Sequence, residues 1–347
     1  MQDAIVGCIL GTAVGDALGL PFEGLSPRRA ERIFGQYDRY RFFLNKGMVS
    51  DDTEHTCMVA QALIESAGEV SLFAELLAGR LRLWLLTLPA GVGFATLRAI
   101  LKLWCGIHPE RSGVFSAGNG PAMRSPIIGV YCGEDHEKIK ALVKAGTVIT
   151  HTDPKAYYGA LAVALAASMN ITTEPVDGAS YYALLKTLLS DASAAEFLEL
   201  IEASVKSSRQ GASPKEFAME LNLQNGVSGY VYHTVPVVIQ AWLRNSDDFE
   251  SAILEVIACG GDTDTTAAIL GGIVGSKTGT AGIPQPWLEN LWEWPRSVSW
   301  LEALGQQLAQ RKQVKAMGLP IMGVIARNIF FTLVVLLHGF RRLLPPY

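Results

Sequence analysis

A glycine at every fourth position near the start of the chain most constrains what this sequence can fold into. The apolar stretch AIVGCILGTAVGDALG predicts a helix from about Ala4 to Leu18. Its recurring glycines are Gly7, Gly11, Gly15 and Gly19. Residues four apart share one face of a helix, so another backbone can approach this face closely. Because glycine is a poor helix former, its repetition indicates a packing requirement. The nearby acids Asp16 and Glu23 favour a buried helix over a small-xxx-small membrane span.

The rest of the sequence is also dominated by helical spacing. Hydrophobic residues make up 49% and charged residues 18% of 347 residues, which is enough apolar material for a sizeable core. The segment SPIIGVYC at 125–132 is the best candidate for a strand and fits a helix equally well. Since no linker or solenoid repeat divides the chain, we expect one compact, mostly α-helical domain over residues 1–313. Helical periods occur at about 52–67, 71–87, 93–105, 137–149, 154–169, 178–190, 194–206, 214–220, 230–244, 248–258, 264–275, 286–293 and 298–312.

Charge and cysteine usage limit the classes of partner and compartment. The net charge is −4, so we expect no nucleic-acid-binding surface. Five dispersed cysteines without CxxC spacing indicate reduced thiols rather than disulfides or a zinc site. The first residues lack the basic region of a secretory signal, so we expect a cytoplasmic protein.

The composition changes after about residue 313. The stretch from Leu319 to Leu337 carries a single charge, Arg327, and about 19 residues is near the length that spans a bilayer. Basic residues flank both ends and therefore give no orientation, while a charge in mid-stretch is costly in lipid. Two interpretations of the tail 314–347 stay open. It is either membrane-associated through 319–340, or a helix docked on the domain or on a partner chain.

Two aspartates and a threonine follow a glycine pair in the segment GGDTDTTAAILGG. Asp262, Asp264 and Thr265 precede an apolar helical run, so N-capping is one interpretation. A cap needs one side chain, however, whereas this segment supplies three hard oxygen ligands.

A second acidic helix start occurs in the segment SDDTEHT, where Ser50, Asp51 and Asp52 precede the helical period at 52–67. Alone it fits an ordinary capping arrangement. If the two clusters face each other, four carboxylates share a small volume and need a cation to stay ionised. Carboxylates and hydroxyls suit magnesium, manganese or calcium rather than zinc. Two acids in each cluster suit two metal ions.

Weaker motifs lie elsewhere in the chain. Glu23 is on the loop after the first helix and could equally be a solvated acid. The segment GVFSAGNGPAMRSP, with Ser116 and Asn119, is a glycine-rich loop of the kind that approaches phosphates, although turn chemistry explains most such loops. His151 in THTDP is either a sugar contact or a turn residue. Tyr230 either stacks on a ligand ring or packs internally.

Together these segments resemble the ADP-ribosylglycohydrolase family. The matching pieces are GCILGTAVGDALGLPFEG, SDDTEHT, SAGNGPAMR, THTDPKA, GYVYHT and GGDTDTTAAILGGIVG, in the family's order across about residues 1–310. The resemblance implies an all-α, compact orthogonal helical bundle with a binuclear magnesium or manganese centre, to which this chain adds a hydrophobic C-terminal helix. The implied metal ligands are Ser50, Asp51, Asp52, Asp262, Asp264 and Thr265.

The resemblance also implies roles around the metals. Glu23 matches a glutamate that gates or assists catalysis, and with Asp52 it is our candidate for proton transfer. His151 would lie on the adenosine or ribose side, with Tyr230 as a further substrate contact. The segment PAGVGFATLRAI lacks an acid where arginine-specific relatives have one, which weakens the case for arginine-linked substrates. The residues implied to border the diphosphate of ADP-ribose are Ser116, Gly118, Asn119 and Gly120.

These implications define the expected function. We expect a hydrolase with two Mg²⁺ or Mn²⁺ ions that removes ADP-ribose from a modified protein side chain or a small acceptor, by cleaving the glycosidic bond at the distal ribose. The alternatives are an ADP-ribose-binding protein without turnover and a structural, crystallin-like member of the family. The acceptor linkage stays open among arginine, serine, other groups and O-acetyl-ADP-ribose.

Overall fold

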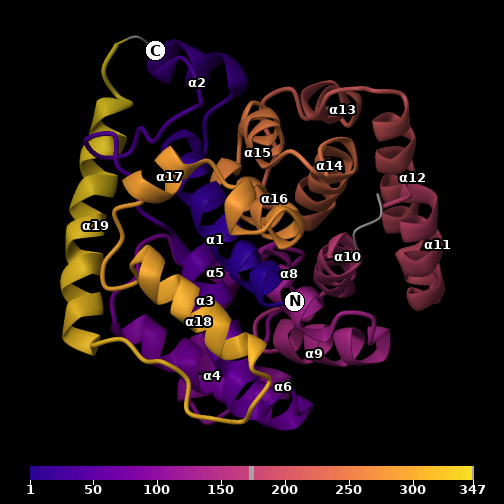
Figure 1. Ribbon diagram of the computed structural model, residues 1–347, viewed down its shortest axis with the longest axis vertical. Coiled ribbons are helices and arrows are strands. Elements are labelled where there is room, and N and C mark those ends of the chain that lie inside the picture. The colour runs from indigo at the N-terminus through magenta and orange to yellow at the C-terminus, as the bar shows by residue number, and fades with distance from the viewer. Residues whose placement is uncertain (172–175, 346–347) are drawn as a thin grey trace.

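The computed structural model describes residues 1–171 and 176–345 and is built from helices (Figure 1). Across these two ranges the only β-structure consists of isolated bridges, so the all-α prediction is confirmed. The helices are α1 (Gln2–Gly19), η1 (Leu20–Phe22), α2 (Pro27–Phe34), α3 (Asp51–Ser66), α4 (Val70–Leu86), α5 (Phe94–Trp104), α6 (Pro109–Ser112), α7 (Gly120–Met123), α8 (Pro126–Cys132), α9 (His136–Val148), α10 (Pro154–Asn170), α11 (Gly178–Leu188), η2 (Ala192–Ala194), α12 (Ala195–Arg209), α13 (Pro214–Glu220), α14 (Val231–Arg244), α15 (Phe249–Ile257), α16 (Thr263–Thr278), η3 (Thr280–Gly282), α17 (Gln285–Asn290), α18 (Val298–Ala309) and α19 (Ile321–Arg341).

Helices α1 and α16 form a closely packed antiparallel pair at the centre of the molecule (Figure 1). A Cβ atom added at Gly7 would lie closer than 3.0 Å to the carbonyl oxygen of Gly275, and one at Gly15 would lie as close to that of Ala267. The glycine stripe is therefore filled by the backbone of α16, which confirms the predicted packing requirement. The partner helix is the one that follows the second acidic cluster.

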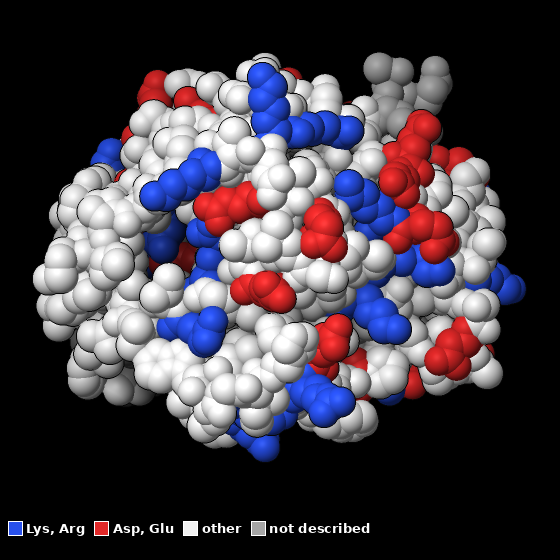
Figure 2. All heavy atoms as spheres, turned by 90° about the horizontal axis from the view of Figure 1, so that it is seen from below, with Lys and Arg blue, Asp and Glu red and all other residues white. Residues whose placement is uncertain are grey.

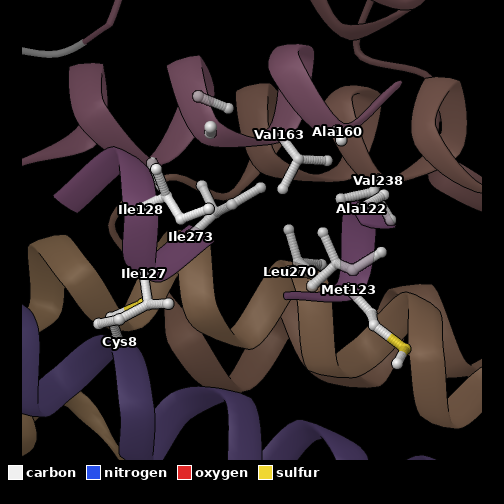
Figure 3. Packing of buried hydrophobic residues seen from close by; sticks show 14 of the residues in the cluster. Cys8, Ala122, Met123, Ile127, Ile128, Ala160, Val163, Val238, Leu270 and Ile273 are labelled. Atoms are coloured by element: carbon white, nitrogen blue, oxygen red, sulfur yellow. The ribbon is translucent and has the colours of Figure 1, made fainter. Parts of the chain in front are cut away.

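The core surrounds this pair on all sides. Every residue of α1 from Ile5 to Gly19 is buried, as is every residue of α16 from Thr263 to Ser276. Figure 3 shows side chains of α8 and α10 converging on Leu270 and Ile273 of α16. A helix that is apolar all round belongs inside a protein. The stretch Gln2–Phe22 is long and apolar enough to cross a membrane, but its apolar 18-residue window is wholly buried within the domain.

The segment 125–132, for which strand and helix were both open, forms α8. Pro126 lies in the first turn, where its fixed φ suits a helix. Gly129 then lets α8 pack against α10, because a Cβ there would come closer than 3.0 Å to the carbonyl oxygen of Ala164. The strand interpretation is therefore wrong. The glycine in this segment serves helix packing, which its apolar composition alone does not distinguish from strand pairing.

Helix α19 runs along one side of the domain with one face packed against it (yellow in Figure 1). Arg327 is buried and donates to the carbonyl oxygen of Val49 at 2.6 Å and to Glu293 Oε2 at 2.7 Å. Asn328 Nδ2 donates to the carbonyl oxygen of Thr87 at 2.8 Å. The polar pair that is costly in lipid is thus satisfied by the protein, so the inner face of α19 is docked. The division of the chain into 1–313 and 314–347 stays a prediction.

Candidate metal and substrate site

The two acidic helix starts meet at one carboxylate. Asp52, in the first turn of α3, is buried, and its Oδ2 accepts hydrogen bonds from Ser50 Oγ at 3.0 Å and from Thr265 Oγ1 at 3.2 Å. Ser50 is the N-cap of α3, and Thr265 lies in the first turn of α16. Segments 213 residues apart in the chain are therefore in direct contact, as the interpretation of the two clusters requires.

Glu23 joins the second cluster. Carboxylate oxygens of Glu23, Asp262 and Asp264 all lie within 4.8 Å of one another. Asp262, the N-cap of α16, accepts from Asn119 Nδ2 at 2.6 Å. The structure therefore brings three carboxylates from the η1 loop and the α16 start to one point, beside the glycine-rich loop.

The glycine pair before Asp262 holds the Glu23 loop in place. Gly24 N–H donates to the carbonyl oxygen of Gly261 at 2.7 Å, and Gly261 N–H donates to that of Leu25 at 2.8 Å. Gly261 has φ 86°, and a Cβ there would collide with the backbone of Val227. A side chain is thus excluded by both conformation and space. The pair is needed for the contact between two loops rather than for flexibility.

Asp16 accepts hydrogen bonds from residues at the start of α3. Its fully buried carboxylate accepts from the N–H of Ser50 at 2.9 Å and, from Thr53, the N–H at 3.1 Å and Oγ1 at 2.5 Å. Burial raises the pKa of Asp16 to about 7. The residue is enclosed by its donors and holds the backbone from which Asp51 and Asp52 project.

The crowding of acids governs the electrostatics of the site. Burial, followed by the charge of neighbouring carboxylates, raises the pKa of Asp51, Asp52 and Asp264 well above the usual range. Burial also raises the pKa of Asp262, and burial together with Asp262 raises that of Glu23. Like charges so close favour protonation unless a cation compensates them.

The donor set fits a hard divalent cation. Among the described residues, Asp52 Oδ1 and Asp264 Oδ1 are buried and have no hydrogen-bond partner. Buried polar atoms normally have a partner, and such exceptions call for an explanation. Carboxylate and hydroxyl oxygens are the ligands that Mg²⁺ and Mn²⁺ prefer. The cluster can therefore hold metal, and these two oxygens are directly suited to it.

A pocket of about 320 Å³ opens above the acidic cluster. Ser50 and Asp52 are buried beneath it, and Tyr230 is not among the residues that line it. The predicted residues that do line it are Glu23, Asp51, Ser116, Gly118, Asn119, Gly120, His151, Asp262, Asp264 and Thr265.

The glycine-rich loop forms one wall of the pocket with His151. Cβ atoms added at Gly118 and Gly120 would lie 3.1 and 3.2 Å from atoms of the His151 ring, so both glycines leave room for the ring. His151 Nδ1 is 2.9 Å from Thr150 Oγ1. Burial and the charge of Arg124 lower the pKa of His151 to about 3. The imidazole is therefore neutral near pH 7.

Tyr230 supports the loop through its backbone rather than through its ring. It is the N-cap of α14 and forms an isolated bridge with Gly118. Its hydroxyl accepts from Lys155 Nζ at 2.9 Å, and its ring contacts Tyr232. Direct stacking of this ring on a substrate stays a prediction that the side-chain placement does not favour.

The predicted site residues did not include any from the start of α5, although the segment PAGVGFATLRAI was noted for its lack of an acid. The available signal was the pair of glycines in PAGVGFAT just before a predicted helix. The side chain of Phe94 is 79% exposed at this position. Helical spacing in the sequence does not explain why such a large apolar side chain should lie at the surface. The missed lining residues are Gly91, Gly93, Phe94, Ala95, Thr96, Met123 and Gly229.

The described fold is all-α, and its helix starts bring carboxylates together beside a polar pocket. The family model described as ADP-ribosylglycohydrolase matches residues 1–316. The chain belongs to the ADP-ribosylglycohydrolase family. Its relatives named as ADP-ribosyl hydrolases support the same class of activity for this chain.

Relatives support the assignment over most of their length. An uncharacterized protein of Archaeoglobus fulgidus is 34% identical, with 84% of this chain and 92% of that protein covered. The ADP-ribosyl-[dinitrogen reductase] glycohydrolase of Rhodospirillum rubrum is 25% identical, with 84% and 91% covered. A solved ADP-ribosylglycohydrolase-related protein complex has the same fold, with a TM-score of 0.64 and 24% identity over 90% of this chain and 99% of that one.

Proposed function

We propose that this chain is a metal-dependent hydrolase that cleaves the glycosidic bond at the distal ribose of an ADP-ribosyl group. The leaving group is a modified protein side chain or a small acceptor. The observation that carries the proposal is the meeting of both acidic helix starts at Asp52, with Glu23, Asp262 and Asp264 beside them under one pocket.

Two Mg²⁺ or Mn²⁺ ions fit this donor set. When bound, such ions supply Lewis-acid polarisation and orient sugar hydroxyls. Asp16 stays outside the ligand set, because its oxygens are taken up by donors from Ser50 and Thr53. The proposed ligands are Ser50, Asp51, Asp52, Asp262, Asp264 and Thr265.

The pocket walls suit the rest of ADP-ribose. Ser116, Gly118 and Gly120 offer a wall of small residues that a diphosphate can approach closely. Asn119 orients Asp262 through its amide and ties the loop to α14 through Thr234, 3.0 Å away. A neutral His151 adds a polar contact without introducing a charge, on the side we assign to the adenosine or its ribose.

Glu23 is the better placed of the two candidates for proton transfer. It lines the pocket, whereas Asp52 is buried beneath and already accepts two hydrogen bonds. In the step, the bond from the ribose anomeric carbon to the acceptor atom breaks and a water oxygen bonds to that carbon. One water proton passes to a carboxylate, and the acceptor atom gains a proton as it leaves. Glu23 is the group we assign to this proton movement.

The acceptor linkage depends on the rim of the pocket. The start of α5 contributes Phe94, Ala95 and Thr96, none of them acidic. This wall offers no carboxylate to a guanidinium group, so we propose that arginine-linked ADP-ribose is not the preferred substrate. A panel of arginine-linked, serine-linked and O-acetyl-linked substrates measures the preference. Faster release from the arginine linkage than from the other two would contradict it.

Release of ADP-ribose from modified proteins, measured with Mg²⁺ or Mn²⁺ and after EDTA treatment, tests the activity. We expect Asp262→Asn and Asp264→Asn to lose at least about 100-fold in rate, the scale of losing electrostatic stabilisation. Full activity in both variants would contradict the assignment of these two aspartates as metal ligands.

The Glu23→Gln variant separates turnover from binding. We expect it to bind ADP-ribose and metal with little change while the rate falls by roughly 10² to 10⁴, the usual contribution of a positioned acid or base. If the wild-type protein binds ADP-ribose tightly and releases it from no modified acceptor, the protein is a reader rather than a hydrolase. Absence of both bound metal and turnover in the purified wild-type protein would point to the structural alternative.

A further inference from the structure

Helix α19 presents a continuous apolar stripe to solvent on the face opposite its docked side. Spacings of three, four or seven residues put these positions on one side of a helix. White spheres, which are uncharged residues, fill the left edge of Figure 2, where α19 lies in Figure 1. Monomeric proteins rarely expose large apolar patches without a partner. The exposed members of the stripe are Met322, Ile329, Leu333, Leu336, Leu337 and Phe340.

Tryptophans extend the patch beyond the helix. Trp292 and Trp294 are 53% and 58% exposed. The Trp292 ring lies 5.9 Å from that of Phe330, edge to face, and a Cβ at Gly323 would lie 3.0 Å from the Trp294 ring. Tryptophan beside an apolar helix is typical of the boundary between water and lipid headgroups, where an amphipathic ring is favoured.

The C-terminal region that contains α19 is positively charged, whereas the complete chain is negatively charged. Between Ala303 and Tyr347 every charged residue is basic, although the complete chain has a net charge of −4. Arg311, Lys312 and Lys315 are exposed before α19, and Arg341 is exposed at its end. Basic residues at both ends of an apolar stripe complement anionic headgroups.

The inner face of α19 argues against a membrane span. His338 Nε2 is 2.9 Å from the carbonyl oxygen of Pro21, and Arg327 is paired with Glu293 inside the protein. Pulling the helix into a bilayer would leave Glu293 buried without this cation and would place Arg327 in lipid, which is costly. The helix can remain docked while its outer face meets a surface.

A second copy of the chain fits this face less well. A helix of 21 residues is about 31 Å long, and a stripe about 10 Å wide gives about 300 Å². Stable interfaces bury about 800 Å² on each partner. The stripe alone falls well short of this area, whereas a lipid surface needs only apolar area and charge attraction.

We propose that α19 docks this protein on anionic lipid bilayers, lying in the plane of the interface with its outer face among the headgroups and upper acyl chains. The inference is independent of the proposed catalytic function. It places the hydrolase at a membrane surface without a spanning segment.

Flotation of the full-length protein with vesicles tests the proposal. We expect the protein to float with phosphatidylcholine vesicles containing about 30% phosphatidylglycerol, to float much less with phosphatidylcholine alone, and to be released by high salt or carbonate. Leu333→Glu with Leu337→Glu should lower the floated fraction at least fivefold. These residues are 55% and 64% exposed, so we expect the folded domain to tolerate the change.

The matched control carries the same charge change elsewhere. Met219→Glu with Leu101→Glu alters residues that are 50% and 49% exposed on α13 and α5, and it should float like the wild type. Circular dichroism and hydrolysis of a soluble substrate check that both variants are folded. Equal flotation of the two double variants would overturn the proposal. So would resistance of the bound protein to carbonate, which indicates a span, or a dimer in solution that the Leu333 and Leu337 changes dissociate.

Discussion

A substitution at Asp264 gives the most direct test of the electrostatics proposed for the acidic site. Its carboxylate is buried among other acids, and among the described residues its Oδ1 has no donor. In Asp264→Asn we expect the metal-free protein at pH 7.5 to be more stable than the wild type, because a crowded charge is removed. Urea unfolding in EDTA measures this difference.

The same variant should lose its response to metal. A ligand that binds only the folded state stabilises it by about 2.7 kcal/mol at 100 times its Kd. We therefore expect Mn²⁺ to raise the melting temperature of the wild type and to leave that of Asp264→Asn nearly unchanged. Glu250→Gln, which removes an exposed acid, is the control and should keep the wild-type response. An equal Mn²⁺ shift in Asp264→Asn would exclude this aspartate as a ligand.

His151 makes stability depend on pH with a defined sign. Its pKa is about 3 in the folded protein, against the ordinary 6.5 when unfolded. Below pH 6.5 the unfolded chain therefore binds a proton that the folded chain does not, and stability falls as pH decreases toward 3. From pH 7 to pH 5 this contribution is about 2 kcal/mol. Urea unfolding of His151→Asn at both pH values should show a smaller loss than the wild type, and equal losses would contradict it.

Among the helices, the close packing of α1 against α16 leads to the clearest prediction for stability. Gly15→Ala would place a Cβ closer than 3.0 Å to the carbonyl oxygen of Ala267. Since that atom is backbone, the helices must separate, and we expect a loss of several kcal/mol together with loss of activity. Gly79→Ala in α4, where an added Cβ meets nothing within 4 Å, should instead be stabilising by up to about 1 kcal/mol. Denaturant unfolding of the two variants side by side makes the comparison.

Helix α19 is tied to the site through Arg327. This side chain bonds the carbonyl oxygen of Val49, directly before Ser50, and pairs with Glu293. Arg327→Met leaves the buried Glu293 without this cation, and we expect a loss of about 3–5 kcal/mol with reduced activity. The double variant Arg327→Met with Glu293→Gln should recover part of the stability in thermal unfolding. No recovery would show that packing of α19 dominates over this ion pair.

At the scale of the whole molecule, the structural features that could be predicted are those set by local sequence patterns. The all-α class and the two acidic helix starts follow from spacing and residue type, since each lies within one segment. The C-terminal helix was predicted at 319–337 and is found at Ile321–Arg341.

Features that depend on distant partners were not predictable. The hydropathy of the C-terminal stretch shows that Arg327 would be costly in lipid. Its ion-pair partner Glu293 lies 34 residues earlier, so local sequence patterns could not predict the pair. Tyr230 turns its hydroxyl to Lys155 because of packing that sequence spacing does not contain. The pocket wall at Phe94 depends on the approach of α5 to the glycine-rich loop. The expected cytoplasmic location stays a prediction.

The glycine contact between α1 and α16 has a consequence for how this protein can change. Because backbone touches backbone along the stripe, no rotamer can absorb a shift between the two helices. A one-residue insertion in either helix would turn its face by about 100° and slide every later contact out of register. The acids on α1 and at the start of α16 would then lose their present relative positions. The glycine stripe therefore fixes, through backbone packing between α1 and α16, where the two helices place their acids.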